Sequence, residues 1–327
     1  MFKFLKPRSS ESTAVTDSFE NTPIDAHALL SRIEWASARR LDGLMQGDYR
    51  TLFRGAGLML ADLREYQPQD DVRHMDWNVT ARMQTPYVRE HEQDRDLTAW
   101  FLVDLSASVG FGSQAVTKRL VMAEYVALLG HLLQRRGNRV GGVLERADLQ
   151  KNLEIIPSRA GKRHLLHLLH RLLNGPLNQS SEPVGLTRLL NGAQRIIKQR
   201  STVFVLSDFL TEPDWEKALL GLASRHDVVA IRLVDPTERE LPDMGMMTLR
   251  DVETNQQVFV DTSDPGFRRR FFEQVQKHED HLTGALSQAG VDCLELSTQA
   301  PVHEELMRFI ERRQRFLRQS RSGPVHV

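Results

Sequence analysis

Two aspartates and two serines in this 327-residue chain stand where a metal ion could be bound. Asp104, Ser106 and Ser108 follow one apolar run at alternate positions, and Asp208 follows a second, similar run. If both runs are strands of one parallel sheet, their carboxyl ends face the crevice in which open α/β sheets bind ligands. Carboxylate and hydroxyl oxygens are hard donors that suit Mg²⁺ or Mn²⁺. A divalent cation would also relieve the repulsion between two neighbouring carboxylates.

Each of these positions also has a purely structural interpretation. Asp104 and Ser106 could cap the helix that follows the first run, and Asp208 could cap a helix that begins near Pro213. The Asp-x-Ser-x-Ser spacing alone occurs by chance in about one chain in ten of this length. The second strand-end aspartate favours the metal site over the capping interpretation.

The elements that would position these residues alternate between short apolar runs and amphipathic helices after Leu97. Alternation of this kind predicts an α/β fold with a mostly parallel sheet and helices on both faces. Strands are expected at 98–103, 139–144, 202–206, 228–233 and 291–296, helices at 115–136, 162–173, 186–199, 215–224, 267–289 and 302–319, and a hairpin from 247–252 to 257–260.

The chain before Leu97 has a different texture. Its first residues are rich in Ser, Thr and charge, which predicts a leader without a fold of its own. Asp25 is expected to cap a helix that ends near Gly43, and short alternating pieces follow it. We therefore expect a leader at 1–23, an N-terminal helix with a small β-containing subdomain at 24–96, the main α/β domain at 97–300, and a C-terminal helix with a basic tail at 301–327.

Composition excludes several classes of protein. Lys+Arg 43 balances Asp+Glu 43, so no nucleic-acid partner is expected. No apolar run approaches the roughly 18 residues that a membrane helix needs, and the N-terminus lacks the features of a secretory signal. The single cysteine, Cys293, permits no intrachain disulfide and excludes thiolate zinc sites. Together these features favour a cytoplasmic protein.

Four stretches of the sequence carry a resemblance to a known family. They are Arg64-Glu-Tyr-Gln-Pro-Gln-Asp70-Asp71-Val-Arg73-His-Met-Asp76-Trp77-Asn-Val-Thr-Ala-Arg82, Tyr87-Val-Arg89-Glu90, Asp104-Leu-Ser106-Ala-Ser108 and Leu206-Ser207-Asp208-Phe209. In these stretches the chain resembles the bacterial domain-of-unknown-function family fifty-eight. The first stretch is long and unusual, which makes the resemblance specific, and the similarity extends from about Arg54 to Asp208.

The resemblance implies both a fold and a way of working. Members of the family are similar to von Willebrand factor A domains, and their genes typically lie beside one for a MoxR-type AAA+ ATPase. The implied fold is Rossmann-like with a metal-ion-dependent adhesion site, in which Asp104, Ser106 and Ser108 approach the ion and Asp208 acts directly or through water. The implied partner is the ATPase, and the implied task is assembly or maturation of other protein complexes, whose identity the sequence does not give.

The sequence departs from the family pattern at two places. Gln69 replaces a turn glycine, which is a minor change. Val184 falls near the position of a loop threonine that normally binds the metal, and valine has no donor oxygen. Ser181 or Thr187 could take that role only in a shifted loop. This departure predicts weak metal binding or a vestigial site.

The first of the four stretches, residues 64–82, is a charged block that allows two interpretations. Its carboxylates, arginines and histidine could form a hydrolase centre, but balanced sets with an aromatic anchor such as Trp77 more often lock a small subdomain onto a sheet. Its candidate interaction residues are Arg64, Asp70, Asp71, Arg73, Asp76, Trp77 and Arg82.

The sequence also lacks two familiar catalytic motifs. It contains neither a G-x-S-x-G elbow at these serines nor a phosphate-binding G-x-x-x-x-G-K-[ST] loop. We therefore favour a metal-dependent protein-interaction module over two alternatives. One is a metal-assisted hydrolase, and the other is a structural scaffold with a vestigial metal site.

Overall fold

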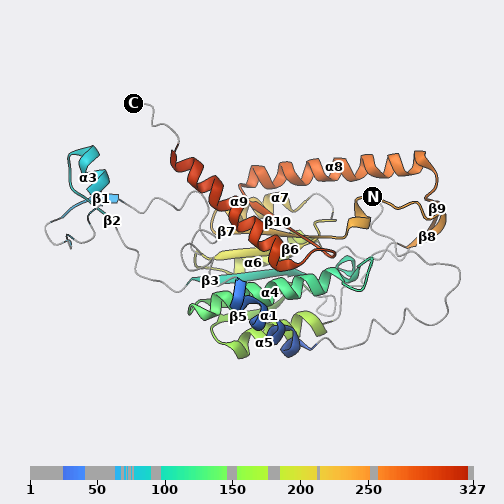
Figure 1. Cartoon of the computed structure of the whole chain (residues 1–327), viewed down its shortest axis with the longest axis horizontal. Coiled ribbons are helices and arrows are strands. Elements are labelled where there is room, and N and C mark those ends of the chain that lie inside the picture. The colour runs from blue at the N-terminus through green and yellow to red at the C-terminus, as the bar shows by residue number, and fades with distance from the viewer. Residues whose placement is uncertain are drawn as a thin grey trace.

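The computed structural model describes residues 25–40, 63–67, 70, 72, 75, 77–89, 97–145, 153–175, 185–211, 214–250 and 257–322. At its centre is a six-stranded sheet in the order β10-β7-β6-β3-β4-β5 (Figure 1). The strands are β3 (Thr98–Asp104), β4 (Arg139–Glu145), β5 (Leu153–Arg159), β6 (Thr202–Ser207), β7 (Asp227–Val234) and β10 (Asp292–Ser297). All neighbouring pairs are parallel except β4 and β5. This is the mostly parallel α/β sheet expected from the sequence.

The antiparallel edge strand β5 was not predicted. Its sequence mixes polar and apolar residues and contains Pro157, which cannot donate a backbone hydrogen bond. An edge strand is hydrogen-bonded on one side only, so it tolerates a proline that a central strand would exclude. The other five strands lie within one residue of their predicted bounds. Of these, β3, β4, β6 and β7 are buried along nearly their whole length, as inner strands covered on both faces are.

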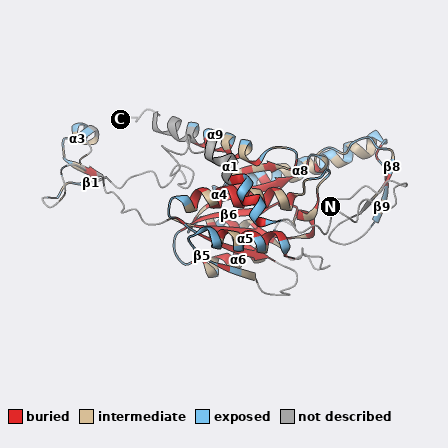
Figure 2. Cartoon of the chain, turned by 60° about the horizontal axis from the view of Figure 1, so that its bottom comes forward, coloured by how far each residue is buried: buried red, intermediate tan, exposed pale blue. Residues whose placement is uncertain are grey.

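Helices cover both faces of the sheet, and a separate hydrophobic core lies on each side. One core is formed with α1 (Ala26–Arg40), α4 (Lys118–Arg135), α5 (Lys162–Asn174) and α9 (Val302–Ser322), and the other with α6 (Leu186–Ile196), α7 (Glu216–Ala223) and α8 (Pro265–Ala289). Short 3-10 helices follow two strands, η3 at Ala107–Gly110 and η5 at Pro236–Glu238. In Figure 2 the inner strands of the sheet are almost entirely buried, whereas much of α8 is exposed or half-buried.

The helices at the two ends of the described chain both belong to the main core. Asp25 caps α1 as predicted, because its carboxylate accepts a hydrogen bond from the backbone N–H of His27 at 2.9 Å. Leu30 of α1 and Phe309 of α9 are buried in the same hydrophobic core as α4. Helices from both sides of the domain expected at 97–300 therefore pack into its core.

Two small antiparallel sheets complete the described structure. β1 (Leu63–Glu65) pairs with β2 (Tyr87–Arg89) beside the short helix α3 (Trp77–Met83), and in Figure 1 these elements lie apart from the six-stranded sheet. β8 (Met246–Arg250) pairs with β9 (Gln257–Asp261), which confirms the predicted hairpin. The expectation that Trp77 anchors its subdomain to the sheet is wrong. Trp77 is the first residue of α3 and is 66% exposed.

Candidate functional site

The predicted site residues meet at the carboxyl edge of the sheet. β3 and β6 are parallel neighbours with Val103 opposite Leu206, so Asp104 at the end of β3 and Asp208 just after β6 lie close together. Their side chains are buried, at 6% and 3% exposure. Burial, reinforced by the charge of Asp208, raises the pKa of Asp104 to about 6. We call Asp104, Ser106, Ser108 and Asp208 the strand-end site.

A chain of hydrogen bonds connects these four residues. Asp104 accepts a hydrogen bond from the backbone N–H of Ser106 at 3.0 Å and another from the Ser207 hydroxyl at 2.7 Å. The hydroxyl oxygens of Ser106 and Ser108 lie 2.9 Å apart. The side chain of Ser108 in turn hydrogen-bonds Asp208. Hydroxyls and carboxylates from two strands thus form one network.

A left-handed residue after β6 sets the direction of this edge. Phe209 has a φ of 57°, which is unusual for a bulky residue, and its buried ring packs against Trp215 with the centroids 5.4 Å apart. In this turn the Ser207 hydroxyl accepts a hydrogen bond from the backbone N–H of Phe209 at 3.0 Å. The Asp208 carboxylate accepts one from the backbone N–H of Leu210 at 3.2 Å. Such strained turns persist where the surrounding structure holds them, often at functional sites.

A buried lysine that the sequence analysis missed is paired with Asp208. Lys118 begins α4, its side chain is 0% exposed, and its Nζ lies 2.9 Å from Oδ2 of Asp208 and also pairs with Glu238. Burial alone would lower the pKa of Lys118, but the two carboxylates raise it. Burial would likewise raise the pKa of Asp208, but the ammonium of Lys118 holds it below the usual range. A lysine at the head of an otherwise apolar helix was the available sequence signal.

Buried carboxylates outnumber the cations that pair with them at this edge. Glu145, opposite Asp104 in the neighbouring strand, accepts a hydrogen bond from Arg188 Nε at 3.0 Å, yet burial raises its pKa to about 8. Burial also raises the pKa of Glu238 to about 7, although Lys118 opposes this shift. With all groups ionised, four carboxylates would face two cations. A divalent cation would supply the missing positive charge.

The donor set of the strand-end site fits a hard divalent cation. Ser106 and Ser108 offer hydroxyl oxygens, and Asp104 and Asp208 offer carboxylates, which is the oxygen chemistry that Mg²⁺ and Mn²⁺ prefer. In the part of the chain that the structure describes, no group of three or more His, Cys, Asp or Glu side chains could hold a metal ion. The two serine hydroxyls are therefore an essential part of any site here.

Of the residues considered for the loop ligand, only Thr187 is described by the structure. Val184 and Ser181 lie outside the described residues. Thr187 lies in α6 and donates its hydroxyl hydrogen bond to Asp214, with the oxygens 2.6 Å apart.

The charged block is described only in part. Asp71, Arg73 and Asp76 lie outside the described residues, as does the side chain of Arg64. The carboxylate of Asp70 accepts a hydrogen bond from the backbone N–H of Gln67 at 2.8 Å, which stabilises a local turn. Trp77 and Arg82 are exposed on α3. The described members therefore form a turn and an exposed surface.

A third strand-end aspartate has a different environment. Asp235 follows β7 and is fully buried. One carboxylate oxygen accepts hydrogen bonds from the backbone N–H and the hydroxyl of Ser113 and from the hydroxyl of Thr298. The other oxygen accepts hydrogen bonds from the backbone N–H and the hydroxyl of Thr237. The five donor–acceptor distances are 2.6–3.0 Å. Burial opposes ionisation, but these donors lower the pKa of Asp235. The sequence analysis missed it, although it too follows an apolar run.

The comparison with known families assigns the chain. The family described as "Protein of unknown function DUF58" matches residues 62–281. The chain belongs to this family. Uncharacterized protein Rv1480 of Mycobacterium tuberculosis and uncharacterized protein Mb1516 of Mycobacterium bovis are relatives of this DUF58 protein. Each is 32% identical to it over 288 residues, which cover 88% of this chain and 90% of the relative.

Several solved structures are similar at low sequence identity. BatB from Bacteroides thetaiotaomicron matches with a TM-score of 0.41 and 11% identity, over 67% of this chain and 99% of BatB. The SpRpn10 VWA domain matches with a TM-score of 0.38 and 12% identity, over 67% of this chain and 95% of that domain.

Among the helices of the described residues, none is long and apolar enough to cross a membrane.

Proposed function

We propose that this DUF58 protein is a metal-dependent protein-interaction module whose binding centre is the strand-end site. The observation that supports this most is the network joining Asp104, Ser106, Ser108 and Asp208 at an edge with more buried carboxylates than cations. A site of this composition gains most from a small divalent cation, Mg²⁺ or Mn²⁺.

Each residue of the site has a separate task. Ser106 and Ser108 offer their hydroxyl oxygens to the ion, and Asp104 holds the Ser106 backbone in place through the 3.0 Å hydrogen bond. Lys118 donates a hydrogen bond to one carboxylate oxygen of Asp208. The other oxygen, which accepts the backbone N–H of Leu210, is the one that would face the ion. A bound ion held by so few protein groups keeps open positions, and an acidic side chain of a partner can complete its coordination.

The proposed partner is a MoxR-type AAA+ ATPase in the cytoplasm, with the pair acting in assembly or maturation of other protein complexes. Family resemblance supports this part of the proposal. A metal-assisted hydrolase is less favoured, because a hydrolase needs a base that is free to take a proton from water. Asp104 and Asp208 already accept hydrogen bonds from serines, a lysine and backbone N–H groups.

Affinity for the purified ATPase, measured by calorimetry in Mg²⁺ and in chelator, tests the proposal. Ser106→Ala removes one metal ligand and is expected to weaken binding about as much as the chelator does. The two losses should not add, because both remove the same ion-mediated contact. Stability should fall by only about 1 kcal/mol. The matched control is Ser287→Ala, on the exposed surface of α8, which should change nothing.

Two results would contradict different parts of this proposal. A complex that forms equally well in chelator would rule out the metal-dependent contact, and attention would pass to the block at 64–82 or the basic C-terminal helix. No complex with the ATPase in either condition would rule out that partner. In that second case, Mg²⁺ binding by the chain alone would still test the metal site.

A further inference from the structure

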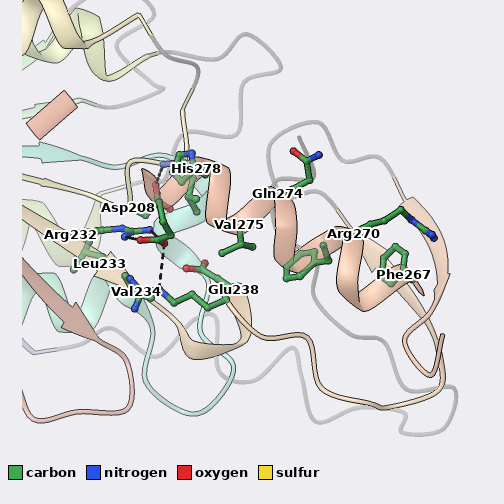
Figure 3. A pocket seen from close by; sticks show the side chains of 14 residues that line it. Asp208, Arg232, Leu233, Val234, Glu238, Phe267, Arg270, Gln274, Val275 and His278 are labelled. Atoms are coloured by element: carbon green, nitrogen blue, oxygen red, sulfur yellow. Dashed lines mark hydrogen bonds and ion pairs between the residues drawn. The ribbon is translucent and has the colours of Figure 1, made fainter. Parts of the chain in front are cut away.

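A cavity of about 450 Å³ lies next to the strand-end site, between the end of β7 and the N-terminal half of α8 (Figure 3). Its walls are mainly apolar, with Leu233 and Val234 on the sheet side and Phe267, Phe271 and Val275 on the helix side. Pockets that bind small molecules have this size and apolar lining, with a few polar groups that fix the ligand's orientation. The carboxyl end of a parallel strand is also where α/β sheets bind ligands.

Two residues that line this cavity, Arg232 and His278, each have a buried side-chain nitrogen without a hydrogen-bond partner. The side chain of Arg232 is only 7% exposed, and its two terminal nitrogens each donate to Glu279 at 2.6 Å, but its Nε has no hydrogen-bond partner. Nε2 of His278 is likewise buried without a hydrogen-bond partner. Unpaired buried donors are costly, so native structures rarely keep several of them in one place.

We infer that this cavity binds a small organic molecule with an apolar body and one anionic hydrogen-bond acceptor, as in an aromatic acid. The apolar body would lie against Phe271 and Val275, and the acceptor would take the N–H groups of Arg232 and His278. Hydrogen bonds from a guanidinium to an anion are stronger than neutral ones, which favours an acid over an alcohol. This binding would be an activity beyond the proposed partner interaction and does not depend on it.

The cavity and the strand-end site share one residue, Asp208. Asp208 and Glu238 line the cavity, and both are paired with Lys118. These two carboxylates do not repel the acceptor as free charges would, because the ammonium lies between them. A bound molecule would therefore lie directly beside the strand-end site.

Two fluorescent probes that differ in one group test the inference on the full chain. Anilinonaphthalene sulfonate has an apolar body with an anionic acceptor, and N-phenyl-1-naphthylamine has the same body without it. We expect saturable one-to-one binding of the sulfonate, weakened about tenfold by Phe271→Ala. The matched control Phe272→Ala removes the neighbouring ring, which is 49% exposed and does not line the cavity, and should leave the affinity within about twofold.

Two further variants separate the body of the ligand from its acceptor. Val275→Trp fills the cavity and should abolish binding of both probes. Arg232→Lys keeps the charge but removes the Nε donor, so it should weaken the sulfonate about tenfold and the neutral probe hardly at all. Thermal melts establish whether each variant is folded. If Val275→Trp does not fold, Phe271→Ala still tests whether the probe binds in the cavity.

Three outcomes would overturn the inference. The first is the absence of saturable binding to the native chain. The second is an equal loss with Phe271→Ala and Phe272→Ala, which would place the probe on the exposed surface of α8. The third is an equal effect of Arg232→Lys on both probes, which would remove the acceptor from the assignment.

Discussion

Two sets of buried carboxylates lie at the same edge of the sheet and are neutralised in different ways. Asp235 accepts five hydrogen bonds from uncharged N–H and O–H groups. Asp208 depends on the ammonium of Lys118, and Asp104 beside it has a raised pKa. Neutral donors saturate the Asp235 carboxylate, whereas under the proposed function a metal ion would complete the neutralisation of the Asp104 and Asp208 carboxylates.

Glu238 connects the two regions. One of its oxygens accepts the backbone N–H of Asp235 at 3.1 Å, and the other pairs with Lys118. Together with the hydrogen bond that the backbone N–H of Thr237 donates to the Asp235 carboxylate, this forms a capping box at the start of η5. The end of β7 is thus rigid on the Asp235 side and charged on the Lys118 side, which makes the two regions separable by substitution.

The largest effect is expected when the buried cation is removed. Lys118→Met leaves Asp208 and Glu238 buried without their counter-charge, and breaking a buried ion pair in this way costs about 3–5 kcal/mol. Chemical denaturation would measure the loss, with Lys217→Met on the exposed surface of α7 as the control. We also expect Mg²⁺ to stabilise the Lys118 variant more than the native chain. A variant with native stability would show that Lys118 is dispensable there.

A smaller loss is expected at the saturated aspartate. Asp235→Asn keeps the shape but weakens hydrogen bonds to a charged acceptor, which are each worth about 1.5–3 kcal/mol. We expect the free energy of unfolding to fall by about that amount. The stabilisation by Mg²⁺ should remain as in the native chain, because Asp235 is not part of the strand-end site. Loss of the Mg²⁺ effect in this variant would erase the distinction between the two regions.

The difference in stability between the native chain and Asp235→Asn should depend on pH. The pKa of Asp235 is lower in the folded chain than its usual value of 3.8, so its contribution to stability is fully present above about pH 4 and is lost as the pH falls through the folded pKa. The difference in unfolding free energy between the native chain and Asp235→Asn should therefore be constant from pH 7 to 5 and shrink below pH 4. Urea denaturation at pH 7, 5 and 3 would measure it. A difference that grows in acid would contradict this assignment.

The smallest effect is expected from the metal itself. At a free Mg²⁺ concentration ten times its dissociation constant, the gain in stability is about 1.4 kcal/mol, which corresponds to a few degrees of melting temperature at this chain length. Calorimetric melts in Mg²⁺ and in chelator should differ for the native chain and for Asp235→Asn, but not for Asp104→Ala. A shift that survives in Asp104→Ala would place the ion elsewhere.

Local sequence patterns were sufficient to predict five of the six strands of the sheet and the convergence of Asp104 and Asp208. Long apolar runs identified β3, β6 and β7, because strands buried on both faces have few polar positions. The rule that parallel strands place their carboxyl ends at one edge then brought Asp104 and Asp208 together. The same rule would have found Asp235, had it been applied to the end of β7. The antiparallel edge strand β5 lacked such a run and was missed.

Only the tertiary structure decided how the charges are paired. Lys118 reaches Asp208 across 90 residues of sequence, and Glu238 joins them from the next strand along the sheet. Trp77 was expected to be an anchor and is exposed, because its short helix does not use it to cover the sheet. Apolar periodicity is a local property that a sequence displays directly. The partner of a buried charge depends on which strand ends and helix starts meet in space, and that is fixed only when the whole sheet has formed.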